Sequence, residues 1–181
     1  MKDPVKLLEK YCGSNHKLFE VLLKHSEAVT KKALSIAKRL KDVDEELVYY
    51  GAMLHDIGVV YTYIPELNPD GKYPYIAHGY LGRQILEKEG MPRIGLFCER
   101  HIGVGITKED IIKQNLPLPL RDMTPQTLEE KLVAFADKFF SKSPDGVVRE
   151  KTVEEVLKNL ARYGEEKVKT FKEWLKIFGE V

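Results

Sequence analysis

The feature that most constrains the fold is a long apolar stripe with helical spacing near the start of the chain. Every third or fourth position carries a residue of this stripe, which runs through Leu18, Leu22, His25, Val29, Ala33, Ile36 and Leu40. That spacing is typical of one face of an α-helix. Later segments show the same periodicity, and we find no convincing alternation of the kind that a half-buried strand shows. The sequence therefore predicts an all-α fold, a single compact helical bundle.

Capping residues and glycines indicate where the first of the later helices begin and end. Gly58 is expected to stop a helix that begins near Asp44. A further helix is expected from about Ala77 to Glu89, ended by Gly90, and Pro92 is expected to begin another that reaches His101.

The second half of the chain shows similar signals. Thr107 with Asp110 is expected to cap a short helix. Thr124, followed by proline, predicts the start of a long helix through Phe140. Thr152 then begins a helix with Glu155 at the matching capping position, before a last amphipathic helix.

The length of 181 residues suits one compact domain, and no internal repeat divides it. We expect a single domain over residues 1–181, with a core of about 18–141 and C-terminal helices, about 152–179, packed on it. For the last helix, core packing and a subunit contact both stay open, so a homodimer stays open too; its apolar residues are Phe171, Trp174, Leu175 and Phe178.

Composition excludes several classes of function. The net charge is +1 and the pI is about 7.7, so specific nucleic-acid binding has no electrostatic support. No segment approaches the ~18–20 apolar residues of a membrane span, and the N-terminal segment has no apolar run like that of a signal peptide. We therefore expect a cytoplasmic protein. Cys12 and Cys98 form no CxxC motif, so neither a zinc knuckle nor a redox motif is present.

Four of the five histidines and two of the aspartates form a candidate set of metal ligands. In chain order they are His25, His55–Asp56, His78, His101 and Asp137. A single histidine on an apolar helix face is more often a hydrogen-bonded core residue than a metal ligand. Asp137, however, also lies on an apolar face, where an unpaired carboxylate costs several kcal/mol. A divalent cation bound by imidazole nitrogens would satisfy all of these groups. A salt bridge from Asp137 to a buried lysine or arginine is the alternative.

This order of residues, with His55-Asp56-Ile57-Gly58 in the HDIG form, resembles the HD-domain superfamily of helical, metal-dependent phosphohydrolases. The resemblance covers roughly residues 18–141. It implies a first metal bound by His25, His55, Asp56 and Asp137, and a second metal that Asp56 shares with His78 and His101. A carboxylate has two oxygens and can span two metals. One or two divalent ions are expected, and Mn, Fe, Ni, Co, Zn and Mg all stay open.

Two departures from the family pattern qualify this picture. Ile102 stands where some dinuclear members have the second histidine of a pair, which leaves the second metal with fewer protein ligands. Val59 and Val60 follow the HDIG run, so the lysine found there in the cyclic-dinucleotide phosphodiesterase branch is missing, and the chain has no GYP motif. The sequence therefore disfavours that branch.

The resemblance implies hydrolysis of a small phosphorylated molecule, with a nucleotide as the first candidate. The reaction would be attack of metal-activated water on phosphorus, in a phosphatase, nucleotidase or phosphodiesterase, with Asp56 in the catalytic set. Two alternatives are kept. One is a di-iron protein of the oxygenase type, and the other is a non-catalytic sensor of a metal or ligand.

Arg100 and Lys138 are the candidate catalytic cations, because each is next to a predicted metal ligand and can bind phosphoryl oxygens. The alternative is that both are ordinary surface charges. The irregular segments 59–77 and 103–122 are expected to form the rim of the site. Substrate preference is expected to depend on four tyrosines of the first segment: Tyr61, Tyr63, Tyr73 and Tyr75.

Overall fold

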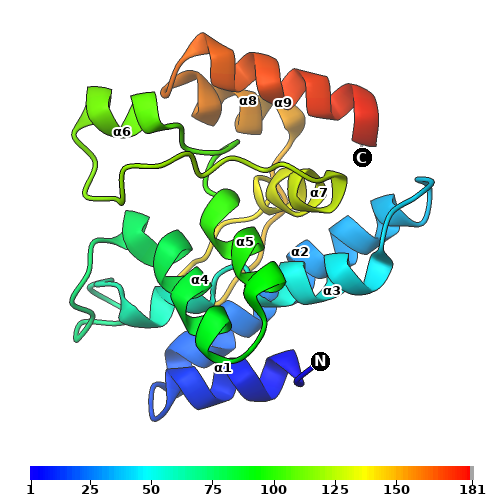
Figure 1. Cartoon of the computed structure of the whole chain (residues 1–181). Coiled ribbons are helices and arrows are strands. Elements are labelled where there is room, and N and C mark those ends of the chain that lie inside the picture. Colours follow the sequence, from blue (N-terminus) through cyan, green and yellow to red (C-terminus); the bar gives the residue numbers. More distant parts are fainter. Residues whose placement is uncertain (180–181) are drawn as a thin grey trace.

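The computed structural model describes residues 1–179, and Figure 1 shows them as packed helices. In chain order the helices are α1 (Pro4–Cys12), α2 (His16–Ala37), α3 (Glu45–Leu54), α4 (His78–Lys88), α5 (Pro92–Arg100), α6 (Lys108–Gln114), α7 (Leu128–Asp137), α8 (Val153–Ala161) and α9 (Glu165–Phe178). Two short 3-10 helices, η1 (Ile57–Tyr61) and η2 (Tyr75–Ala77), precede α4. Over residues 1–179 the only β-type pairing consists of isolated bridges. The all-α prediction is confirmed.

The apolar stripe of helix α2 faces the interior of the bundle, as its spacing predicted. Five apolar residues of the stripe are at most 2% exposed: Leu18, Leu22, Val29, Ala33 and Ile36. His25 is 1% exposed and lies in the same row. Helices α1, α3 and α7 pack against α2. Because His25 occupies a core position, any partner of its ring must also be inside the bundle.

The C-terminal helices extend this core. In Figure 1, α8 and α9 lie together beside α7, while α1 lies at the opposite end of the molecule. The ring of Phe135 on α7 is 5.0 Å from that of Phe171 and 5.1 Å from that of Phe178, both on α9. Trp174 is 4% exposed and belongs to the same apolar cluster. Helix α9 therefore buries its aromatic face against the helix that ends in Asp137.

Some helix boundaries differ from those that the sequence predicted. Helix α7 begins at Leu128, not at Thr124, because Met123 exchanges backbone hydrogen bonds of 3.0 and 2.8 Å with Ile106 and keeps the next residues extended. Thr127 caps the helix instead, accepting a hydrogen bond from the Glu130 N–H. The two expected capping boxes, at the starts of α6 and α8, are both present. Helix α1 was not predicted, although Asp3 caps it and proline begins it.

Gly58 does not end a helix as the sequence suggested, since α3 already stops at Leu54. Its backbone has no positive φ. The glycine is needed because η1 lies directly against α4. A Cβ at Gly58 would lie 2.0 Å from the carbonyl oxygen of His78 and 2.4 Å from the backbone nitrogen of Gly82. The absence of a side chain therefore sets the distance between Asp56 and the helix that carries His78.

We expect Gly58→Ala to loosen this contact. The added methyl group would meet backbone atoms, so η1 and α4 would have to separate, at a cost of about 1–3 kcal/mol in the free energy of unfolding. Urea unfolding in the presence of a chelator measures that cost without any contribution from metals. Gly90→Ala, with open space around its Cβ position but a φ of 77°, is a control for backbone strain alone. An unchanged unfolding midpoint for Gly58→Ala would contradict the packing argument.

Candidate metal centre

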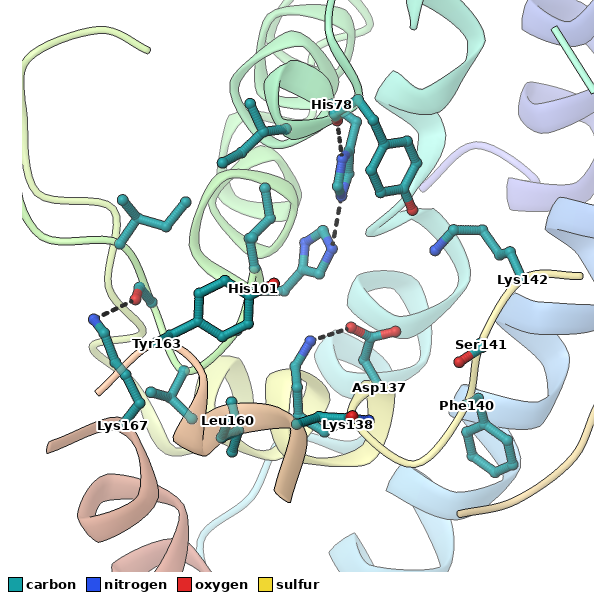
Figure 2. A pocket seen from close by; sticks show the side chains of 18 of the residues that line it. His78, His101, Asp137, Lys138, Phe140, Ser141, Lys142, Leu160, Tyr163 and Lys167 are labelled. Atoms are coloured by element: carbon teal, nitrogen blue, oxygen red, sulfur yellow. Dashed lines mark hydrogen bonds and ion pairs between the residues drawn. The ribbon is translucent and has the colours of Figure 1, made fainter. Parts of the chain in front are cut away.

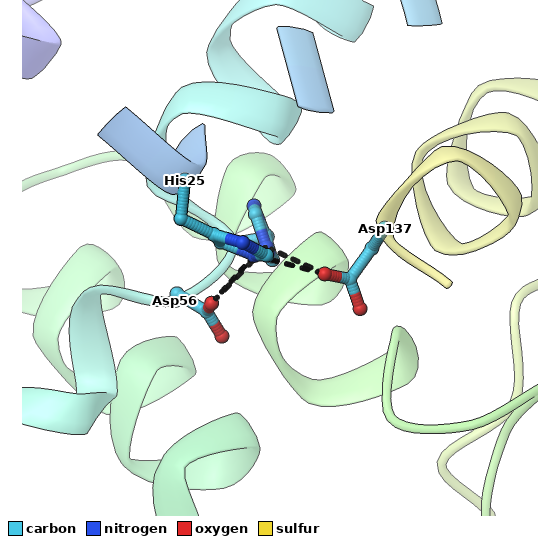
Figure 3. A group of neighbouring side chains, drawn as sticks. His25, Asp56 and Asp137 are labelled. Atoms are coloured by element: carbon cyan, nitrogen blue, oxygen red, sulfur yellow. Dashed lines mark hydrogen bonds and ion pairs between the residues drawn. The ribbon is translucent and has the colours of Figure 1, made fainter. Parts of the chain in front are cut away.

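The first group of predicted ligands meets at one point inside the bundle. His25 Nε2 lies 3.0 Å from Asp137 Oδ1 and 3.2 Å from Asp56 Oδ2. His55 Nε2 lies 3.3 Å from the same Asp56 oxygen and 3.4 Å from Asp137 Oδ1. Figure 3 shows the His25 ring between the two carboxylates. Atoms bound to one ion at ~2.0–2.2 Å lie roughly 3.0–3.5 Å from one another, so this spacing fits a shared cation.

A second group uses the other oxygen of Asp56. Oδ1 lies 3.4 Å from His78 Nε2 and 3.3 Å from His101 Nε2, and these two nitrogens are 3.3 Å apart. Asp56 Oδ1 is buried and has no hydrogen-bond partner among residues 1–179. A buried carboxylate oxygen without a donor is costly, and a cation held with His78 and His101 would satisfy it. The residues present therefore fit two metal ions joined by one carboxylate.

Three of the four histidine rings are oriented by hydrogen bonds to backbone carbonyls, while the buried Nδ1 of His25 has no hydrogen-bond partner among residues 1–179. Nδ1 of His55 lies 2.6 Å from the Ala52 carbonyl oxygen, and Nδ1 of His78 lies 2.6 Å from that of Tyr75. His101 Nδ1 makes the same contact with Cys98, at 2.7 Å. When Nδ1–H donates in this way, the Nε2 lone pair points at the cluster, which is the tautomer that metal-binding histidines use.

Helix ends place these ligands. His55 caps the end of α3, His101 caps the end of α5, and Asp137 is the last residue of α7. His78 is the first residue of α4, and Asp56 lies between α3 and η1. Only His25 comes from the middle of a helix. Loops join these ends, so the centre opens on the side where the loops run.

The negative charges of Asp56 and Asp137 in the first group favour binding of a cation. Burial opposes ionisation of Asp56, but Lys142 and His55 outweigh it and hold the Asp56 pKa well below its ordinary value. Burial would lower the pKa of His55, yet the charge of Asp56 and contacts with Asp137 raise it to about 10. Without a metal, the His55 ring therefore carries a positive charge between the carboxylates, and a bound metal would replace that proton.

The second group differs, because its histidines stay neutral. Burial lowers the pKa of His78 to about 3, despite the nearby charge of Asp56. Burial also lowers the pKa of His101. Neutral imidazole is the form that binds metals. At pH 7 both rings are ready to accept a cation without first losing a proton.

Two lysines stand beside the carboxylates, and the sequence identified only one of them. Lys138 Nζ lies 2.6 Å from Asp137 Oδ2. Lys142 Nζ lies 2.6 Å from Asp56 Oδ2 and 5.7 Å from the centre of the Tyr75 ring. Figure 2 shows both lysines among the side chains that line the pocket, with Asp137 and His78. Lys142 was missed because it follows α7 in an irregular segment, where spacing says nothing about direction.

Arg100, the other predicted catalytic cation, has a different environment. Its Nη1 donates to both carboxylate oxygens of Glu130, at 3.0 Å each. Among residues 1–179, Arg100 is not one of those that line the pocket. Its charge is used in a partly buried ion pair between α5 and α7, so the geometry favours a structural contact.

A pocket of about 880 Å³ opens on the metal centre and reaches His78, His101 and Asp137. The two predicted rim segments line two sides of it, including Tyr63 and Tyr75 but, among the described residues, not Tyr61 or Tyr73. Residues 138–151 and helices α8 and α9 form a further wall that the sequence did not indicate. Much of the lining is apolar, and its apolar residues include Ile102, Val104, Ile106, Leu116, Val156 and Leu160.

The glycine pair in the second rim segment forms a turn. Gly103 and Gly105 have φ of 60° and 105°, values that favour glycine. The N–H of Gly105 donates to the Ile102 carbonyl at 2.9 Å, and its carbonyl accepts from Lys167 at 3.1 Å. Because the Gly105 N–H is already used, the two glycines serve to form the turn and this N–H is not open to a phosphate.

Comparison with known proteins shows which family and which relatives this chain is similar to. The family described as HD domain matches residues 22–141. An uncharacterized protein of Methanocaldococcus jannaschii is 42% identical over 132 residues, which are 72% of this chain and 69% of that protein. Two proteins named tRNA (cytidine(56)-2'-O)-methyltransferase, from Picrophilus torridus and Thermoplasma volcanium, are 39% and 37% identical. The matches cover 67% and 75% of this chain but only 32% and 35% of the methyltransferases.

Solved structures show the same fold. The HD domain of the L. monocytogenes phosphodiesterase PgpH superposes with a TM-score of 0.55 at 20% identity, covering 96% of this chain and 86% of that one. The same domain in complex with cyclic-di-AMP gives a TM-score of 0.55 at 19% identity, covering 97% and 98%. No helix within residues 1–179 combines the length and apolar character that crossing a membrane requires.

Proposed function

The chain belongs to the HD-domain family, and on that premise we propose that it is a metal-dependent phosphohydrolase acting on a small phosphorylated substrate. The observation that carries the proposal is the division of Asp56 between two groups of ligands, with Oδ2 facing His25 and His55 and Oδ1 facing His78 and His101. Two cations held by these residues would supply Lewis-acid chemistry to a phosphoryl group.

When bound, the metals would act as Lewis acids and lower the pKa of a water molecule for attack on phosphorus. The chain's own groups supply orientation and charge. The carbonyls of Ala52, Tyr75 and Cys98 fix the histidine rings. Lys142 and Lys138 pair with Asp56 and Asp137, and with metals on these carboxylates their ammonium groups would be available for phosphoryl oxygens.

Lys142 also bears on the branch of the family. No lysine follows the HDIG run here, but Lys142 brings an ammonium group to Asp56 from another part of the chain. The site thus has a lysine beside Asp56 although none follows the HDIG run. The name of PgpH and its cyclic-di-AMP complex make a dinucleotide one of the substrates to be screened, together with mononucleotides. The methyltransferase activity of the two archaeal relatives is not proposed for this chain, which matches only about a third of each.

A nucleotide is our first candidate for the substrate. The pocket of about 880 Å³ is within the range of ~300–1,000 Å³ that small-molecule sites occupy. Its apolar lining suits a base, and the Tyr75 ring, whose centre is 4.6 Å from that of His78, stands next to the second metal position. The pocket thus supports an organic group attached to the phosphate.

The test of this function is metal analysis of protein purified without chelator, followed by a hydrolysis screen. The screen covers mononucleotides, cyclic nucleotides and cyclic dinucleotides with Mn, Co, Ni, Fe and Mg. We expect release of phosphate or of a nucleoside monophosphate without consumption of oxygen. Oxygen uptake with no hydrolysis of any substrate would favour the di-iron alternative. Metal binding with neither reaction would favour the sensor.

The two ligand groups predict different losses on mutation. His78→Ala and His101→Ala should each lose one equivalent of metal and keep the first, because His25, His55 and Asp137 do not depend on them. Elemental analysis after dialysis measures the metal content, with His16→Ala, an exposed histidine that belongs to neither group, as the matched control. Loss of both metals from either variant would contradict two separable sites.

A further inference from the structure

Residues 138–151 fold back on α7 and bring three lysines to the pocket. Lys138, Lys142 and Lys151, the lysine cluster, all line it. The Lys151 backbone N–H donates to the Phe139 carbonyl at 2.8 Å, which returns the segment to the end of α7. Next to it, Glu150 pairs with the buried Lys32. The position of Lys151 is therefore fixed from both α7 and α2.

Lys151 differs from the other two lysines because, among residues 1–179, it forms no ion pair within 4.0 Å. In contrast, Lys138 forms an ion pair with Asp137, and Lys142 forms one with Asp56. Asp137 is close enough for its charge to raise the pKa of Lys151, but it already pairs with Lys138. Other acidic groups are used as well: Glu150 by Lys32, Glu155 by Arg149 and, across the pocket, Asp110 by Lys167.

This arrangement destabilises the positively charged form of Lys151. Its side chain is partly buried. Burial, and after it the positive charge of Lys138, lower its pKa. Two bound metals would add more positive charge near the cluster, and Asp137 and Asp56 would then be occupied by metals. A group of cations held together in this way is stabilised by an anionic ligand.

One phosphoryl group does not use all of this charge. A phosphate bound to the metals would lie near Lys138 and Lys142, because these two lysines are next to Asp137 and Asp56. Lys151 comes from the other end of the segment, next to α8, and the pocket continues there past Val156 and Leu160. An anion beyond the first phosphate, attached to an organic group, would fill that space.

We propose that the site takes an organic phosphoanhydride, in which a terminal phosphate binds the metals and the next phosphate binds the lysine cluster through Lys151. The proposal rests on the proposed function and names its substrate class. In hydrolysis, a bond forms between a water oxygen and the terminal phosphorus, and the bond from that phosphorus to the bridging oxygen breaks. The electron pair stays on the bridging oxygen of the next phosphate, where the lysines stabilise it, and the proton of the water goes to solvent.

The test compares one phosphate with two linked ones in the absence of turnover. Protein loaded with Mn²⁺ is titrated by calorimetry with inorganic phosphate and with methylenediphosphonate, which is not hydrolysed. Metal content after ultrafiltration shows that the diphosphonate has not removed the metal. We expect the diphosphonate to bind at least about 10-fold more tightly, as one added charged hydrogen bond gives.

Lys151→Gln should reduce this preference by about 10-fold and leave phosphate affinity within about 2-fold of wild type. Lys158→Gln, an exposed lysine on α8 that does not line the pocket, is the matched control and should keep the wild-type ratio. Equal affinity of the wild type for both probes overturns the inference, and so does an unchanged ratio in Lys151→Gln.

The binding test separates this inference from the proposed function. Diphosphonate preference that depends on Lys151 supports the subsite even in a protein that hydrolyses nothing in the screen. Hydrolysis of simple monophosphates without any diphosphonate preference overturns the subsite and leaves the phosphohydrolase proposal standing.

Discussion

Asp56→Ala should leave the protein without stoichiometric metal at either site and without measurable hydrolysis. No other residue contributes to both groups, since its Oδ2 faces His25 and His55 and its Oδ1 faces His78 and His101. Loss of metal-based stabilisation is worth several kcal/mol, so we expect a decrease of more than about 1,000-fold in kcat/KM.

The measurement combines elemental analysis with the rate on the best substrate of the screen. Asp56→Asn tests the same point without leaving a cavity, because it keeps the shape and removes the charge. Asp70→Ala, at an exposed aspartate in the first rim segment, is the control. Near-stoichiometric metal in folded Asp56→Ala or Asp56→Asn protein would refute the bridging role.

Lys142→Met should lower kcat/KM by about 10- to 100-fold while metal content stays at the wild-type level. The ammonium group is 2.6 Å from Asp56 Oδ2, and a charged hydrogen bond to a phosphoryl oxygen is worth about 1.5–3 kcal/mol. Metal retention is expected because the lysine competes with a cation for the carboxylate and does not bind the metal.

Arg100→Met provides the contrast. Its guanidinium is held by Glu130, so the substitution should lower the free energy of unfolding and change kcat/KM by less than about 3-fold. A Lys142→Met enzyme with wild-type kinetics, or an Arg100→Met enzyme that has lost its activity without loss of stability, would reverse our assignment of the two cations.

The helical fold and the close grouping of the six predicted ligand residues could both be predicted from sequence, for different reasons. Apolar spacing shows which face of α2 is buried, and His25 interrupts an otherwise apolar row there. The other five residues were assigned to the same site as His25 from their order along the chain, which resembles the family motif, and not from helical spacing. The structure brings all six together in two groups that share Asp56.

The parts that could not be predicted depend on contacts between distant segments. The helix α7 begins late because Met123 pairs with Ile106, which no local signal near Thr124 reveals. Gly58 is required by the backbone of α4, not by its own conformation. Lys142 and Lys151 lie in an irregular segment, and only the folded chain shows that this segment returns to the metal centre.

Because the predicted ligands are far apart in the sequence, metal binding would couple folding to the supply of metal. His25 and Asp137 are 112 residues apart in sequence, and the other ligands come from four more helix ends between them. An unfolded chain does not hold these groups together, so metals would bind the folded state alone. By mass action, a free metal concentration 100 times the dissociation constant adds about 2.7 kcal/mol to the stability of the fold. The melting temperature should therefore rise with the logarithm of free metal, and a cell that runs short of the ion would hold less of the folded protein.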